Sequence, residues 1–133
     1  SSSTLTEIDE NSSYYRKKYK LLNFFNKKNN YETFDLKIYK LSDYIKKKEL
    51  KYINFLKIDT EGSEFEVIEG LENYIEIVGL IMFEHHYDNM LKKKYTFSTI
   101  HRYLLKCNFK KIYKSKMPFR KTFEYIYLNK GLN

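Results

Sequence analysis

The residues of this chain that could do chemistry stand at two points, each directly after an apolar run. Asp59 and Glu61 follow INFLKI, and Glu84, His85 and His86 follow IEIVGLIMF. Histidine titrates near neutral pH, so it is the natural general base among these side chains. Acidic groups and imidazoles also ligate metal ions, but no HExxH or CxxC spacing supports a metal centre, and we expect none.

The two apolar runs predict two strands that are covered on both faces, Tyr52–Ile58 and Ile77–Phe83. A helix is expected between them, because Gly62 allows a sharp turn and Ser63 and Glu66 match the capping box S-x-x-E. A right-handed crossover makes such strands parallel. Both sets of polar residues would then lie on one rim of the sheet, where α/β proteins bind ligands.

Each set also has a purely structural interpretation. Carboxylates are common in the first turn of a helix, so Asp59 and Glu61 could merely tie a tight turn to the helix N-terminus. Side chains alternate along an extended segment, so only one of His85 and His86 can face the crevice. The coincidence of acids and histidines at both strand ends favours a functional site over two separate structural roles.

The remaining segments predict an α/β fold with an antiparallel hairpin at its end. The alternation in YETFDLKIYK (31–40) indicates a half-exposed strand, and Ser42 or Asp43 could cap a helix that reaches about Leu50. Thr96 is a candidate cap for a helix with an apolar face up to Cys107, and a basic amphipathic helix is expected from Tyr14 to Phe25. We expect one domain over 1–133, with an irregular or helical lead-in (1–30), a core (31–133) and hairpin strands at 109–114 and 122–128.

The composition excludes some classes of protein and leaves the oligomeric state open. The net charge is +8, but 22 of the 25 basic residues are lysine, and amino acids with A/T-rich codons dominate, so a biased genome accounts for the charge without a specific nucleic-acid partner. No apolar run is long enough to span a membrane. The single cysteine, Cys107, predicts a structural thiol and fits a cytoplasmic protein. The chain starts at Ser1 without methionine, which suggests a piece of a longer protein or a processed one.

The segment FLKIDTEGSEFEVIEG resembles the hallmark strand, turn and helix of the FkbM family of S-adenosylmethionine-dependent methyltransferases, with its L-K-I-D-x-E-G core. KIYKLSDYIKK before it and IMFEHHYD after it are similar to the family's flanking segments, and the closing hairpin fits a class I methyltransferase. The resemblance covers about residues 34–128. It implies the C-terminal part of a Rossmann-like class I methyltransferase sheet.

The resemblance implies S-adenosylmethionine as the cofactor and places Asp59, Glu61, Glu84 and His85 at the rim that faces the substrate and the transferred methyl group. The implied reaction is O-methylation of a hydroxyl on a small molecule or sugar, with His85 as the base and the carboxylates orienting the hydroxyl or stabilising the sulfonium. One departure is clear: none of the four glycines forms the G-x-G loop that cradles the cofactor in the family. The alternative is a non-enzymatic α/β module for interaction or basic binding.

Overall fold

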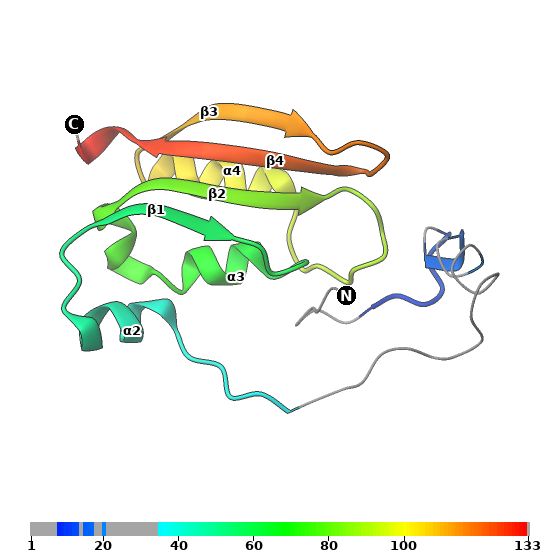
Figure 1. Ribbon diagram of the computed structural model, residues 1–133, viewed down its shortest axis with the longest axis horizontal. Coiled ribbons are helices and arrows are strands. Elements are labelled where there is room, and N and C mark those ends of the chain that lie inside the picture. Colours follow the sequence, from blue (N-terminus) through cyan, green and yellow to red (C-terminus); the bar gives the residue numbers. More distant parts are fainter. Residues whose placement is uncertain (1–7, 14, 18–19, 21–34, 133) are drawn as a thin grey trace.

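The centre of the protein is a four-stranded sheet with the strand order β1-β2-β4-β3 (Figure 1). The computed structural model describes residues 8–13, 15–17, 20 and 35–132. Its elements are, in chain order, α2 (Leu41–Lys48), β1 (Ile53–Ile58), α3 (Glu64–Glu69), the 3-10 helix η1 (Glu72–Ile77), β2 (Val78–His86), α4 (Phe97–Lys106), β3 (Phe109–Lys116), β4 (Thr122–Asn129) and the 3-10 helix η2 (Lys130–Leu132).

The pairing of the strands confirms the predicted class. β1 and β2 are parallel neighbours, with Ile58 opposite Phe83, as expected of two apolar strands joined by one helical crossover. β4 pairs antiparallel with both β2 and β3, so the terminal hairpin is also confirmed. The pairing with β4 runs as far as His86 opposite Thr122, which carries β2 three residues past its predicted end at Phe83.

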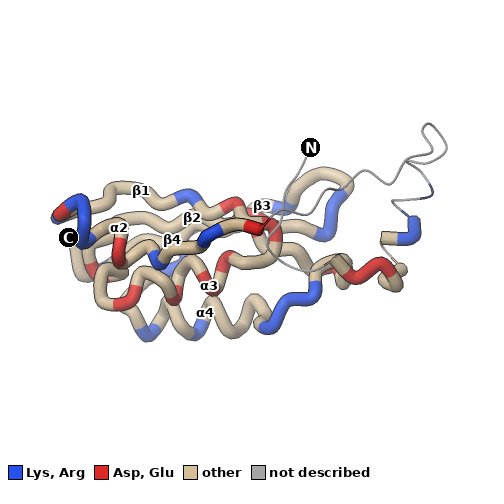
Figure 2. The backbone as a smooth tube through the Cα atoms, turned by 90° about the horizontal axis from the view of Figure 1, so that it is seen from below, with Lys and Arg blue, Asp and Glu red and all other residues tan. Residues whose placement is uncertain are grey.

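Helices α3 and α4 lie on the same side of the sheet (Figure 2). Ile81 and Phe83 of β2 and Tyr125 and Tyr127 of β4 are buried on that side. The aromatic rings stack on one another, with the ring centroids of Phe83 and Tyr125 5.6 Å apart. Phe97 at the start of α4 covers Tyr125 at 4.3 Å. Burial of each such ring contributes roughly 1.5–3 kcal/mol to folding, so this face holds the core.

Several local predictions near the N-terminal side differ from the structure. Residues 35–40 form no strand, and Leu36 and Ile38 are 69% and 70% exposed. A half-buried strand needs a neighbour that completes its backbone hydrogen bonds, and the described strands offer this segment none. Ser42 is not a cap but a buried residue inside α2, whose N-cap is Lys40. The helix expected over residues 14–25 falls largely outside the described residues.

The helix after β1 is shorter than its apolar stripe predicted. α3 ends at Gly70, and the chain continues in η1, so Ile68 and Ile75 are both buried but belong to two helices. A Cβ at Gly70 would lie 3.2 Å from the carbonyl oxygen of Glu66 and 3.7 Å from the backbone nitrogen of Leu41. The close approach of α2 and α3 is consistent with the packing reason expected for this glycine.

The capping box predicted at Ser63 and Glu66 does not form. Ser63 is the N-cap of α3, but its side chain makes no capping hydrogen bond. The carboxylate of Glu64 instead accepts a hydrogen bond from the backbone N–H of Gly62, with 2.6 Å between nitrogen and oxygen. The turn before the helix is therefore stabilised by the residue after the cap.

Among the described residues, no helix is both long and apolar enough to cross a membrane.

Candidate functional site

The ends of β1 and β2 bring an acid and a histidine into contact. Oε2 of Glu61 lies 3.1 Å from Nε2 of His86, and the histidine side chain is 8% exposed against 21% for the glutamate. On the other side of the imidazole, Nδ1 lies 3.0 Å from Oγ1 of Thr122 and 3.8 Å from Oδ2 of Asp88. The imidazole is therefore held from both sides, and Glu61 is the more exposed member of its ion pair.

The charges around His86 stabilise its protonated form. The carboxylate of Asp88 has the largest effect, and that of Glu61 adds to it, so together they raise the pKa of His86 although burial of the ring acts in the opposite direction. The same contact lowers the pKa of Asp88 against the effect of its burial. Glu61, His86 and Asp88 thus form a chain of alternating charge that runs from the rim into the protein.

Asp59 and Glu84 lie on the same rim, as predicted from the parallel strands. Asp59 follows Ile58 directly, and Glu84 follows the paired residue of β2. The pKa of Glu84 is raised by partial burial and then by the nearby carboxylates of Asp59 and Glu124, the latter directly opposite on β4. The ion pair between Lys57 and Asp59 is long, at 3.4 Å, and half exposed, so it contributes little to stability.

The structure does not place His85 at the crevice. Its side chain is buried against the rings of Tyr87, Tyr95 and Phe97, with centroid distances of 4.8, 6.1 and 5.9 Å. Burial, with a smaller effect from the Lys93 ammonium, lowers the pKa of His85 to about 4, so the ring is neutral at physiological pH. The expectation that His85 is the histidine at the rim is therefore wrong: His86 is the histidine that meets Glu61.

The reason is the length of β2. Residues two apart on a strand share a face, so Glu84 and His86 lie together once the strand extends that far. Pairing with Thr122 of β4 provides the extension. The period-two rule applied beyond Phe83 would have found His86, whereas Asp88, Thr122 and Glu124 had no recognisable signal because they come from a loop and a distant strand.

The turn that carries Glu61 is fixed by contacts with the loop after β2. Glu64 is 1% exposed, and its backbone N–H and its carboxylate both hydrogen-bond the hydroxyl of Tyr95, which lies at the end of that loop. Lys93 of the same loop donates from its ammonium to the backbone carbonyl of His86, the residue directly before the loop. Ile8 forms a β-bridge with Leu91, so the lead-in of the chain also touches the loop.

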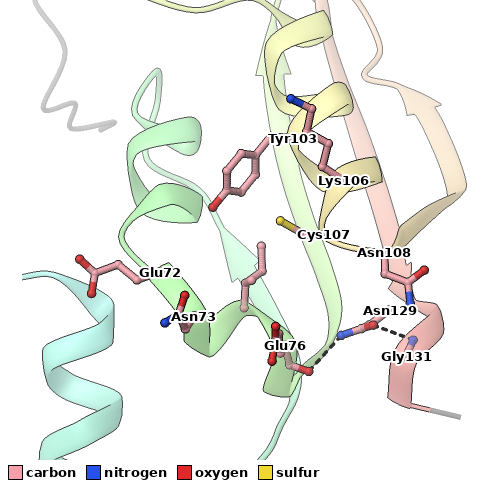
Figure 3. A pocket seen from close by; sticks show the side chains of 10 residues that line it. Glu72, Asn73, Glu76, Tyr103, Lys106, Cys107, Asn108, Asn129 and Gly131 are labelled. Atoms are coloured by element: carbon pink, nitrogen blue, oxygen red, sulfur yellow. Dashed lines mark hydrogen bonds between the residues drawn. The ribbon is translucent and has the colours of Figure 1, made fainter.

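A hollow in the described part of the chain lies away from the rim. It has a volume of about 550 Å³ and sits between η1, the end of α4 and η2 (Figure 3). Asn129 closes its floor by donating to the carbonyl oxygens of Glu76 and Val78, each at 3.1 Å, and by accepting from the N–H of Gly131 at 2.9 Å. Cys107 lines this hollow, and partial burial raises the pKa of its thiol. None of the rim residues contributes to it.

No group of three or more His, Cys, Asp or Glu side chains in the described residues is arranged to hold a metal ion. In the comparison with protein families, residues 2–111 match the family described as the methyltransferase FkbM domain. The match covers most of the chain, including Asp59, Glu61 and His86. Neither the curated proteins nor the solved structures give a significant match.

Proposed function

Because the chain belongs to the FkbM methyltransferase domain family, we propose that it forms the acceptor side of an S-adenosylmethionine-dependent O-methyltransferase. The observation that carries this proposal is the contact between Glu61 and His86 at the shared end of two parallel strands. Transfer to a hydroxyl requires that its proton be removed, and an imidazole next to a carboxylate is suited to that task.

The rim suits only one part of the proposed cofactor, the positively charged sulfonium. Asp59 and Glu84 place carboxylates on the rim, and negative groups suit a positive sulfonium. No G-x-G loop is present in the chain to receive the nucleoside. The residues therefore do not fit the whole cofactor, and the chemistry we assign to this chain is confined to the acceptor.

We assign proton removal to the pair of Glu61 and His86. Glu61, the more exposed member, accepts a hydrogen bond from the acceptor hydroxyl and orients it. As the O–H bond breaks, the Glu61 carboxylate takes the proton and passes it to Nε2 of neutral His86, which lies 3.1 Å from its Oε2. His86 must be neutral for this role. Because its pKa is raised, the rate is expected to rise with pH through a value above the ordinary 6.5 of histidine.

The acceptor we propose is a hydroxyl of a small molecule or a sugar. A specific nucleic-acid substrate is disfavoured, since Arg16, Arg102 and Arg120 are the only arginines and base recognition relies on arginine forks. A cytoplasmic location stays a prediction from the single cysteine.

The test is methyl transfer by the complete gene product that contains this chain, with methyl-labelled S-adenosylmethionine and panels of hydroxyl and amine acceptors. We expect label on a hydroxyl, and a loss of about 10²-fold or more in turnover for Glu61→Gln. Glu66→Gln, an exposed change on α3, is the matched control and should retain activity. Absence of transfer to any acceptor would favour the non-enzymatic module, and an active Glu61→Gln variant would remove the assigned pair.

A further inference from the structure

Glu61 reaches His86 from a turn with an unusual backbone conformation. The φ angles are 50° at Glu61 and 107° at Gly62, both in the left-handed region. Glycine adopts that region readily, but a residue with a side chain seldom does. A glutamate stays in such a conformation only where its surroundings hold it there.

The buried carboxylate of Glu64 supplies a hold on this turn. Its Oε1 accepts from the N–H of Gly62 at 2.6 Å, one residue after Glu61. Its Oε2 accepts from the hydroxyl of Tyr95, and the same hydroxyl accepts from the backbone N–H of Glu64 at 3.1 Å. Glu64 and Tyr95 are 1% and 8% exposed, so these hydrogen bonds are shielded from competing water.

The loop that carries Tyr95 also contacts His86. Tyr95 lies at the end of the loop that begins directly after His86, and Lys93 of the same loop donates to the backbone carbonyl of His86. Glu61 and His86 are therefore both fastened to the segment between β2 and α4. A shift of this segment would change the distance between them.

We propose that Glu64 and Tyr95 are positioning residues, which hold the Gly62 turn so that the carboxylate of Glu61 stays in contact with the imidazole of His86. The catalytic relevance of this contact rests on the proposed function, whereas the geometric coupling does not. Neither residue reaches the rim itself. Their effect on the reaction is transmitted through the turn.

The test is a titration of the three histidines by NMR in the unmodified chain and in Tyr95→Phe. Carboxylates of Asp88, Glu61 and Glu64 raise the pKa of His86, while the phenol of Tyr95 is uncharged at neutral pH. Removing its hydroxyl takes away no charge, so it can act on His86 only through Glu64, which that hydroxyl binds, and through the turn that Glu64 holds. We expect the pKa of His86 in Tyr95→Phe to fall toward the ordinary histidine value of about 6.5.

Tyr127→Phe is the matched control. It removes another buried phenol that hydrogen-bonds a histidine, with 2.8 Å between its oxygen and Nδ1 of His101. Tyr127 lies opposite Ile81, five positions before His86 on β2. This variant should lower the melting temperature and change the His101 resonances without moving the pKa of His86.

A Tyr95→Phe variant that melts earlier but keeps the pKa of His86 would overturn the proposal and leave the contact as a stabilising one only. Should that variant fail to fold, amide exchange in the unmodified chain decides: the Gly62 N–H should be strongly protected, and exchange at the rate of an open turn would overturn the proposal. Neither measurement involves methyl transfer. If the pKa of His86 falls in Tyr95→Phe but the protein transfers no methyl group, the positioning role is therefore kept and only the proposed function is rejected.

Discussion

Nε2 of His86 lies 3.1 Å from Oε2 of Glu61, across the ends of two parallel strands. The contact joins residues 25 positions apart in the sequence, and the crossover through α3 is what brings them together. Thr122 and Asp88 hold the other nitrogen of the ring. This arrangement gives the imidazole one orientation and a raised pKa, and both properties have measurable consequences.

The ion pair should make the stability of the fold depend on pH above neutrality. The pKa of His86 is raised in the folded state, so the folded chain binds the imidazole proton more tightly than the unfolded chain does. The resulting stabilisation is fully present below pH 6.5 and is lost as the pH rises through the folded-state pKa. Urea unfolding across pH 5.5 to 8.5 should therefore show a difference between the unmodified chain and His86→Gln that shrinks with rising pH. A difference that grows with pH would contradict the raised pKa.

His85 should have the opposite effect at acid pH. Its pKa is lowered to about 4, so stability is full above pH 6.5 and falls as the pH drops toward 4, by about 3 kcal/mol in total. His85→Phe keeps an aromatic ring among Tyr87, Tyr95 and Phe97 and removes the buried titratable group. In urea unfolding, this variant should lose less stability between pH 6.5 and 4 than the unmodified chain. His101→Phe, the control, should retain the steep loss, and equal pH profiles for the two variants would refute the assignment.

The chain by itself should bind S-adenosylmethionine weakly or not at all. The rim supplies carboxylates, but the chain has no glycine loop for the nucleoside. Isothermal titration calorimetry of this chain should show no saturable heat at micromolar cofactor. Micromolar affinity would mean that the described residues contain a cofactor site that their sequence does not reveal.

Asn129 should be a major stabilising residue at the opposite end of the sheet. Its side chain is 4% exposed and makes three hydrogen bonds to backbone groups of η1, β2 and η2. Asn129→Ala leaves those groups without their partner, at a cost of about 3 kcal/mol. Chemical denaturation measures this loss. Asn73→Ala is the control, because Asn73 is exposed and lines the same hollow as Asn129. It should change the free energy of unfolding by no more than about 0.5 kcal/mol. Equal losses of stability in the two variants would show that the hydrogen bonds of Asn129 do not stabilise the fold.

The parts of the fold that followed from the sequence are those governed by long apolar patterns. The runs that became β1 and β2, the stripe and Thr96 cap of α4, and the hairpin of β3 and β4 were all predicted. The expectation that β1 is covered on both faces was wrong, since β1 pairs only with β2 among the described strands and Phe55 is 48% exposed. The exposed segment 35–40 alternates like a strand but forms none, so an apolar pattern alone does not decide where a strand forms. Alternation indicates which face a strand would bury but not whether a neighbour exists to pair with it.

The site could be predicted only in part, since tertiary contacts select among local alternatives. Asp59, Glu61 and Glu84 come together at the rim because the strands are parallel. His86 replaced His85 because β4 lengthens β2, a contact between distant segments. Likewise, Ser63 and Glu66 fit a capping pattern, but the buried contact of Glu64 with Tyr95 stabilises the turn instead.

The most direct test of the account compares turnover of His86→Gln and His101→Gln in the complete gene product. The account predicts a loss of about 10²–10⁴-fold for His86→Gln, the contribution of a positioned general base, and near-normal turnover for His101→Gln. His85→Phe, measured in the same assay at pH 7.5, should also remain active. An unchanged rate in His86→Gln, or a large loss in His85→Phe with His86→Gln active, would contradict the assignment of the base.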